Sequence, residues 1–325
     1  MVERWDRIGR TAAYGAAASL VPYLVIKVSW VVGSLLGLLP VGRGFSLGGW
    51  LVLNTLTIGM AAAGITLGLA LVRPWGMRIP GRLVGFVAWV GSGFLVSILP
   101  FLLVSALIHS ASGSSGGSGS ANGDAAMPGW EAVLLQCSFV GTGIGLAMAL
   151  PAYLWRRWPH ALRRPQRPRA SPGPLWPAVT GTATGLAWLY WAAGGPLGIA
   201  HRDERPADWH VLVGVSACWA LAACTAVPAL IRNRSARLPY PLLLAVAWLG
   251  SGSMFAWSGW RLPATIYVAV AQPSDVSYPE NVAVAVTLHV IAVVTGAGII
   301  RALIRGDRGR RASVPDRGGQ AAERV

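Results

Sequence analysis

The chain has 325 residues, of which 54% are hydrophobic and only 12% are charged, and its formal net charge is +15 at pH 7. An ordinary soluble domain carries about 25% charged residues, so this composition argues against soluble dehydrogenases, nucleotide-binding folds and disordered proteins. The mean hydropathy of +0.53 indicates a polytopic membrane protein instead.

Stretches of about 20 apolar residues follow one another along the whole chain, and each is long enough to cross a hydrocarbon core about 30 Å thick. There are eight of them, at about 12–39, 50–72, 83–108, 133–155, 178–200, 210–231, 242–260 and 282–304. The apolar run of the first is too long for a cleavable signal peptide. We therefore predict an all-α fold, a polytopic bundle of eight transmembrane helices.

The basic residues between these stretches predict the orientation. With a cytoplasmic N-terminus, 22 of the 27 basic residues lie in cytoplasmic segments, and only Arg43, Arg202, Arg205 and Arg261 lie outside, with Lys27 in the membrane. This positive-inside asymmetry predicts a multi-pass protein of the cell membrane with both termini in the cytoplasm. Basic residues spread over five segments, without interleaved aromatic residues, argue against nucleic-acid binding.

Two connecting segments differ in composition from the rest. Residues 110–126 are rich in Gly and Ser, which predicts a flexible external linker. Residues 156–169 are rich in Arg and Pro and lie next to a predicted span, which favours contact with anionic lipid headgroups. Membrane lipids are therefore the expected partners, and no protein partner is identified.

The two halves of the chain resemble each other. Residues 88–93 (AWVGSG) match 247–252 (AWLGSG), whereas the fourth segments align poorly. Because each half holds an even number of segments, both enter the membrane in the same sense, so the predicted 4+4 repeat is parallel. The matched tryptophans are Trp50 with Trp209 and Trp89 with Trp248 at an offset of 159, and Trp30 with Trp191 at an offset of 161.

The repeat predicts the domain organisation. We expect a first four-helix repeat over 1–158, a cytoplasmic linker rich in Arg and Pro over 159–174, a second four-helix repeat over 175–305 and a disordered basic tail over 306–325.

A short run at the end of the fifth segment carries a family resemblance. Residues 189–198 read LYWAAGGPLG, similar to the Tyr-Trp-Ala-x-Gly-Gly signature of a family of small four-helix bacterial membrane proteins of unknown function. Residues 29–34 (SWVVGS) form a degraded copy in which the Tyr and the second Gly are replaced. The resemblance implies a four-helix unit duplicated in tandem, and it implies no mechanism.

Lys27 is the most informative single residue. It lies near the middle of the first predicted span, where a charge costs roughly 2.5–3.5 kcal/mol, and no acidic residue lies in the middle of any span. It could serve a proton-linked site, bind a carboxylate or phosphate, or act as a reactive amine. Alternatively, it snorkels, or is satisfied by Asn54, Ser29 or a backbone carbonyl.

The candidate ligand-binding residues are polar or aromatic groups within the predicted spans. Tryptophans there could line a cavity or simply pack, and an intramembrane histidine or glutamine more often makes a helix–helix hydrogen bond. The candidates are Lys27, Trp30, Asn54, Trp188, Trp191 and His289.

No catalytic residue, metal site or cofactor is predicted. P-loop and HExxH patterns are missing from the sequence, and no nucleophile elbow is predicted. The ionisable loop at 201–210 could offer two histidines and a carboxylate to a metal, but their spacing matches no known ligand pattern.

Three functions remain open at this point. The leading hypothesis is non-ATP-driven binding or transport of a small apolar or amphiphilic molecule between the two halves. The second is a membrane-embedded enzyme that modifies a lipid or isoprenoid, with Lys27, His289, His210 and the loop at 201–210 as its available acid–base groups. The third is a structural or accessory subunit whose glycine-rich helix faces dock a partner protein.

Overall fold

The computed structural model of the chain describes residues 2–41, 46–111, 129–157, 175–232, 238–271 and 279–312. Most of the predicted Gly/Ser-rich linker, the predicted Arg/Pro-rich linker and the end of the predicted tail lie outside these residues. The described part is helical, with one isolated bridge between Ile199 and Glu280 in place of any sheet. The helices are α1 (Val2–Leu35), α2 (Leu47–Ala70), α3 (Pro74–Arg78), α4 (Gly81–Ala111), α5 (Gly129–Arg157), α6 (Trp176–Ala192), α7 (Ala207–Arg232), α8 (Tyr240–Ala271) and α9 (Val282–Ala312), with a short 3-10 turn at Arg202–Glu204.

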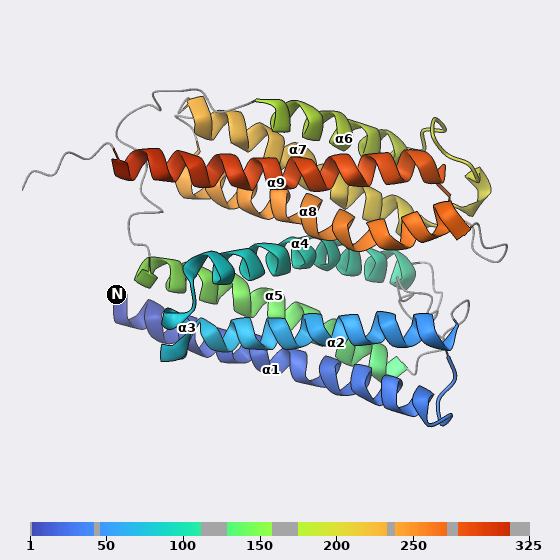
Figure 1. Cartoon of the computed structure of the whole chain (residues 1–325), viewed down its shortest axis with the longest axis horizontal. Coiled ribbons are helices and arrows are strands. Elements are labelled where there is room, and N and C mark those ends of the chain that lie inside the picture. Colours follow the sequence, from blue (N-terminus) through green and yellow to red (C-terminus); the bar gives the residue numbers. More distant parts are fainter. Residues whose placement is uncertain are drawn as a thin grey trace, which may run out of the picture.

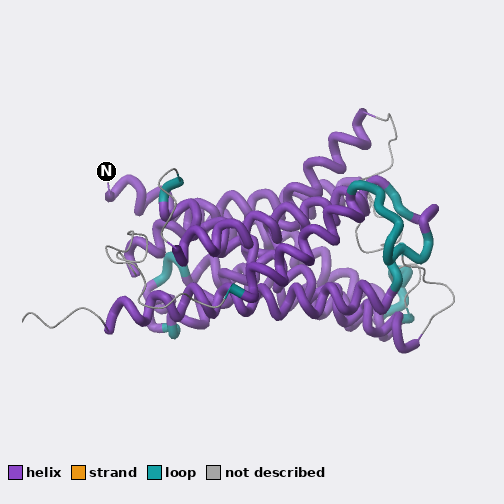
Figure 2. The backbone as a smooth tube through the Cα atoms, turned by 90° about the horizontal axis from the view of Figure 1, so that it is seen from above, coloured by secondary structure: helices purple, strands orange, loops and turns teal. Residues whose placement is uncertain are grey.

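The long helices run back and forth along one axis, and their connections lie at the two ends of the bundle (Figures 1 and 2). The N-terminus, the short helix α3 and the last residues of α5 and α9 lie at one end, called here the N-terminal end. The C-terminal ends of α1, α6 and α8 lie at the opposite end. Helices α1 and α6, which open the two halves of the sequence, therefore run in the same direction.

Seven of the described helices are long and apolar enough to cross a membrane, namely α1, α2, α4, α5, α7, α8 and α9. The chain is thus a helical, multi-pass membrane protein, and the prediction of eight spans is confirmed for seven. Helix α6 has only 17 residues, about 26 Å at 1.5 Å per residue. It ends at Ala192 and not near 200 as predicted, because Gly194 follows with a φ of +94° and turns the chain away.

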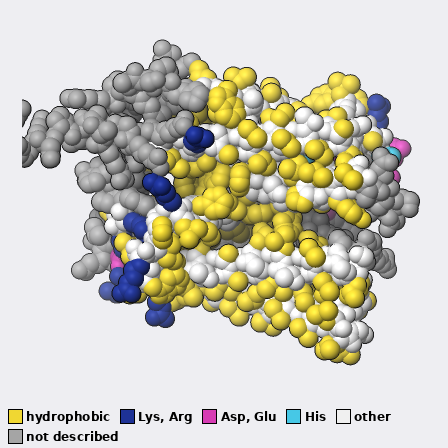
Figure 3. Space-filling view, in the orientation of Figure 1, with side chains coloured by type: hydrophobic (Ala, Val, Ile, Leu, Met, Phe, Trp, Pro, Cys, Tyr) yellow, Lys and Arg dark blue, Asp and Glu magenta, His cyan; other side chains and the backbone are white. Residues whose placement is uncertain are grey.

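Side-chain types separate along the bundle axis. Figure 3 shows described Lys and Arg side chains gathered mainly at the N-terminal end, while apolar side chains cover the long middle of this face. Many large apolar residues of the long helices are more than half exposed, as lipid contact requires, for example Val25, Val52, Leu103 and Ile144.

The helices form two groups joined by α4. Helices α6, α7, α8 and α9 enclose a complete four-helix bundle, whereas α1 packs between α2 and α5 in the other group. Helix α4 packs more extensively against α8 and α7 than against α2 or α5 of its own half. The first half is therefore less closed than the predicted four-helix unit.

Small residues allow α4 and α8 to cross at backbone contact. A Cβ atom on Gly93 would overlap the carbonyl carbon and oxygen of Gly252. Beside the crossing, the indole of Trp89 donates to the Ser251 hydroxyl at 3.1 Å, and the buried hydroxyls of Ser97 and Ser253 are 2.8 Å apart. Without a hydrophobic effect between helices in lipid, such close packing and buried hydrogen bonds hold the two groups together.

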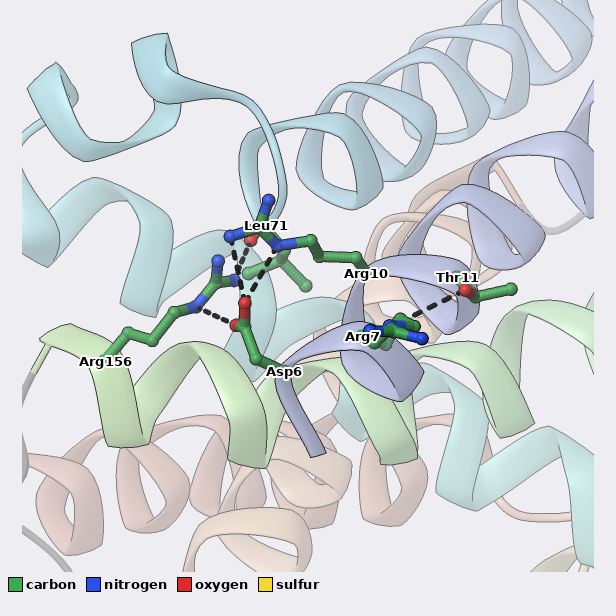
Figure 4. Close-up of polar contacts among 6 residues, drawn as sticks. All are labelled: Asp6, Arg7, Arg10, Thr11, Leu71 and Arg156. Carbon is green, nitrogen blue, oxygen red and sulfur yellow. Dashed lines mark hydrogen bonds and ion pairs between the residues drawn. The ribbon is translucent and has the colours of Figure 1, made fainter. Parts of the chain in front are cut away.

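Arginines at the N-terminal end hold helix ends together. Arg156 pairs with Asp6 at 3.3 Å and donates to the carbonyl oxygen of Leu71, just past the end of α2, at 2.6 Å, while Asp6 also binds Arg10 (Figure 4). The neighbouring Arg157 donates to the carbonyl oxygens of Gly76 and Ile79. These two side chains, expected from the sequence to contact lipid headgroups, thus also bind protein atoms.

Candidate functional site

The first cluster of candidate residues lies between α1 and α2, toward the opposite end. The Lys27 Nζ atom lies 3.9 Å from the ring centroid of Trp30, and that indole stacks on Trp50 with centroids 5.8 Å apart. Asn54 donates from its amide to the carbonyl oxygen of Trp50 at 2.8 Å. Lys27, Trp30 and Asn54 are thus brought together, with Trp50 as the centre that links them.

The sequence places Lys27 near the middle of the predicted span, and in the structure it lies in the last third of α1. Helix α1 begins at Val2 and ends at Leu35, so Lys27 lies eight residues from its end, about 12 Å along the axis. The side chain is buried, with 3% of its surface exposed, beneath the rings of Tyr23 and Trp30. An ammonium over aromatic faces gains a cation–π attraction, which offsets part of its burial cost.

The Tyr-Trp-Ala-x-Gly-Gly run forms the turn that ends α6. Its tryptophan, Trp191, donates to the carbonyl oxygen of Leu197 at 2.7 Å, and the Tyr190 hydroxyl accepts from the Leu197 backbone N–H. Gly194 and Gly198 both have positive φ, a conformation that favours glycine. The motif residues therefore form a turn that folds the segment up to Gly198 back over the C-terminal end of α6.

The second cluster surrounds a small pocket inside the four-helix group at the opposite end. The pocket leaves a volume of about 10 Å³ for the centre of a water-sized group, enough for a single water molecule or a group of that size. Aromatic side chains line it from α6 and α8, and polar side chains line it from α7, α8, α9 and the segment before α9. The lining residues are Trp188, Trp191, Val213, Ser216, Trp257, Arg261, Glu280, Ala285 and His289.

Glu280 is the acidic group of this pocket and is 3% exposed. Its Oε1 atom accepts a hydrogen bond from the indole of Trp209 at 2.8 Å and lies 3.8 Å from the Arg261 guanidinium. The segment that carries it is fixed by backbone bonds to the turn after α6, among them the Asn281 N–H to the Gly198 carbonyl oxygen at 2.8 Å. The turn after α6 and the segment before α9 together hold this buried carboxyl at the end of the four-helix group.

Two buried polar atoms of the pocket have no hydrogen-bond partner among the described residues. They are Oε2 of Glu280 and Nδ1 of His289. The imidazole of His289 comes from α9 and lies with its centroid 6.1 Å from that of Trp188. Most buried side-chain polar atoms in proteins are paired, so each exception calls for an explanation.

The six candidate residues therefore fall into two places. Lys27, Trp30 and Asn54 share the first cluster, whereas Trp188, Trp191 and His289 share the pocket. The pocket lies within the second helix group and not between the halves, where the leading hypothesis placed the ligand.

Sequence reasoning missed the charged part of the pocket. Glu280 precedes the last predicted span, so no hydropathy pattern marks it as buried. Arg261 was placed in an outer loop, but α8 continues to Ala271 and carries it within the helix. Trp50 and Trp209 were not among the candidate residues, and the signal that pointed to them was their match at an offset of 159.

Comparisons with known proteins identify no relative. No family model matches the chain, and neither the curated proteins nor the solved structures contain a match. The described residues also hold no group of three or more His, Cys, Asp or Glu side chains arranged to bind a metal. The pocket is therefore the feature of the molecule that bears on function.

Trp50 and Trp209 allow a matched test of the buried carboxyl. Trp209→Phe removes the N–H that donates to Glu280, and Trp50→Phe removes one that donates to the Ser34 hydroxyl at 3.1 Å. Hydrogen bonds to charged groups contribute about 1.5–3 kcal/mol and neutral ones about 1 kcal/mol. We expect Trp209→Phe to lower the free energy of unfolding in detergent by about 1 kcal/mol more than Trp50→Phe. Equal losses would contradict this role of the indole.

Proposed function

We propose that this chain is a protein of the cytoplasmic membrane, with both termini in the cytoplasm, that binds a small amphiphilic molecule at its outer end without using ATP. The orientation is supported by the Lys and Arg side chains at the N-terminal end (Figure 3) and by the positive-inside rule. The pocket then opens toward the outer face. At the cytoplasmic face, the exposed arginines of the first turns of α1 are placed to contact anionic headgroups.

A parallel duplication is part of this proposal, and contacts at matching positions support it. Trp30 stacks on Trp50, and their counterparts Trp191 and Trp209 have centroids 6.5 Å apart. The α4–α8 crossing joins Gly93 to Gly252, which are themselves 159 positions apart. Ser92 and Ser251, also a matching pair, donate to the carbonyl oxygens of Trp89 and Trp248 at 3.1 and 3.0 Å.

The fourth helices of the halves also correspond, at a different offset. Residues 142–145 read TGIG and 295–298 read TGAG, which gives an offset of 153. Gly145 packs on Ala16 of α1, and Gly298 packs on Trp176 of α6, the counterpart of α1. The offset of 153 is six residues smaller than 159, so the chain before α9 is six residues shorter than the matching chain before α5. These agreements support a duplicated unit in which each half keeps an aromatic cluster at the outer end.

The observation that carries the proposed function is the pair of unpartnered atoms in the pocket. Leaving a buried polar atom unpaired costs about 1–3 kcal/mol, and a ligand that pairs with both atoms recovers that cost on binding. The pocket admits only a group of about water size. It therefore suits the polar end of an amphiphile whose apolar part lies along the exposed apolar surface of the neighbouring helices.

Mass spectrometry of the purified protein tests this function. We expect one small amphiphile to co-purify in mild detergent with the wild type and to be lost from Trp257→Leu, which removes a ring from the pocket wall. The control is Trp155→Leu on α5, where the tryptophan is 60% exposed. Identical sets of bound molecules in all three proteins would contradict ligand binding at the pocket. Transport is then tested by uptake of the identified compound into proteoliposomes.

A membrane enzyme is the second candidate, because Glu280 and His289 place a carboxyl and an imidazole in one pocket, the pairing that general acid–base catalysis uses. The other groups considered for such chemistry have structural partners. His210 Nδ1 lies 3.1 Å from the Ala192 carbonyl oxygen, and Asp208 accepts from the Ser105 hydroxyl at 2.6 Å. Chemical change of the bound amphiphile during incubation would favour the enzyme, and its recovery unaltered would favour binding or transport.

A further inference from the structure

The chemistry of the pocket narrows the class of ligand, an inference that rests on the function proposed above. Three features constrain the ligand: two buried atoms without hydrogen-bond partners, aromatic walls and a water-sized volume. Each feature restricts the group that can occupy the pocket.

The unpartnered oxygen, Oε2 of Glu280, is a hydrogen-bond acceptor in a carboxylate whose charge is partly compensated. Trp209 and Arg261 both approach the other oxygen of Glu280, Oε1. The Arg261 nitrogen is 3.8 Å away, beyond hydrogen-bond distance, so the guanidinium compensates the charge without satisfying Oε2. A ligand bound here must donate a hydrogen bond to Oε2, because a carboxylate only accepts.

The unpartnered histidine nitrogen adds a second acceptor. A neutral imidazole has one N–H donor and one lone pair, and a lone pair on Nδ1 of His289 suits the same donor group that Oε2 requires. His289 is 6% exposed, so bulk water does not replace the missing partner. Two unpartnered acceptors on residues of one pocket call for a group with at least two hydrogen-bond donors.

We propose that the pocket binds a protonated primary amine. Such a group has three N–H donors in one compact charge, which matches two acceptors and a cavity of water size. The rings of Trp188, Trp191 and Trp257 line the same pocket, and aromatic faces attract a cation. A single hydroxyl has one donor only, whereas a quaternary ammonium and an ionised carboxylate have none. Arg261 also lines the pocket, and its charge is partly compensated by Oε1 of Glu280.

Tryptophan fluorescence measures this binding directly, because three of the lining residues are tryptophans. The full chain is placed in nanodiscs of phosphatidylglycerol, which has no amine, and titrated with ethylammonium, tetramethylammonium or ethanol. We expect saturable binding of ethylammonium, at least tenfold weaker binding of the other two probes, and at least a tenfold loss of ethylammonium affinity in Glu280→Gln and His289→Phe. Ser258→Ala is the control, because the Ser258 hydroxyl is also buried without a partner but does not line the pocket.

Each alternative outcome has a distinct meaning. Equal binding of tetramethylammonium would overturn the proposal in favour of a purely aromatic site, and equal binding of ethanol would overturn the need for charge. Failure of ethylammonium to bind, while the wild type still carries its co-purified amphiphile, would overturn the amine and leave the proposed function in place. Failure of both measurements would overturn both.

A further arm of the same titration distinguishes an amine on a lipid headgroup from an amine on a free solute. Phosphatidylethanolamine in the nanodisc carries the same primary ammonium on a lipid. If the amine belongs to a lipid headgroup, this lipid competes and weakens ethylammonium binding. If the amine belongs to a free solute, ethylammonium binds equally well in both membranes. Glu280→Gln is expected to abolish the competition, since a headgroup uses the same acceptor atoms. Unfolding temperatures of the variants without probe show whether the pocket is intact.

Discussion

Replacement of Gly93 by alanine is expected to separate the two helix groups or to prevent stable folding. The added Cβ would overlap backbone atoms of Gly252, and backbone cannot move aside as the end of a side chain can. Overpacking of this kind costs typically about 1–3 kcal/mol and sometimes more, and the shifted helices would also strain the Trp89–Ser251 and Ser97–Ser253 hydrogen bonds. We expect the free energy of unfolding in detergent to fall by about 3 kcal/mol or more.

Gly91 provides the matched control for this substitution. It lies two residues away on α4, and a Cβ there would meet nothing within 4 Å. Gly91→Ala should leave stability unchanged or raise it slightly, since alanine favours the helix more than glycine does by about 1 kcal/mol. Equal stability of the two variants would contradict backbone contact at the crossing.

The fold was predictable to the extent that local sequence determines it. Long apolar stretches predict membrane-spanning helices because an isolated helix satisfies its own backbone in lipid, and seven such helices are present among the described residues. The end of α6 depends on backbone conformation at Gly194, which hydropathy does not report. The packing of α4 against α8 depends on which helix faces of small residues meet, and each half of the chain contains several such faces.

The candidate site was predictable only in part. Intramembrane polar and aromatic residues are unusual enough to attract notice singly, and this identified Trp188, Trp191 and His289. Their meeting with Glu280 and Arg261 depends on two connections that fold back over the end of the bundle. Such contacts join residues about 80 positions apart, and no local pattern carries that information. The separation of Lys27 from the pocket has the same origin, because the two clusters belong to different helix groups.

Arg157 is expected to be the most important cation for stability at the N-terminal end. It is partly buried and donates to the carbonyl oxygens of Ile79 at 2.7 Å and Gly76 at 3.1 Å, and also to the Tyr153 hydroxyl. These bonds tie the end of α5 to the connection between α2 and α4. Hydrogen bonds from a charged donor contribute about 1.5–3 kcal/mol each, and they are not additive, so Arg157→Met should lower the free energy of unfolding by about 3 kcal/mol.

Arg10→Met distinguishes this structural role from lipid contact. Arg10 has 55% of its side chain exposed, and its ion-pair partner among the described residues is Asp6 on the same helix, at 2.9 Å, a kind of pair that contributes less than about 1 kcal/mol. If Arg157 binds protein atoms, Arg157→Met destabilises the protein in detergent without lipid, and Arg157→Lys restores only part of the loss, because one ammonium does not match the planar fork of a guanidinium. If Arg157 instead binds lipid headgroups, Arg157→Met and Arg10→Met behave alike in detergent and differ only when anionic lipid is added. The first result would show that Arg157 stabilises the fold, and the second would show that it binds the membrane surface.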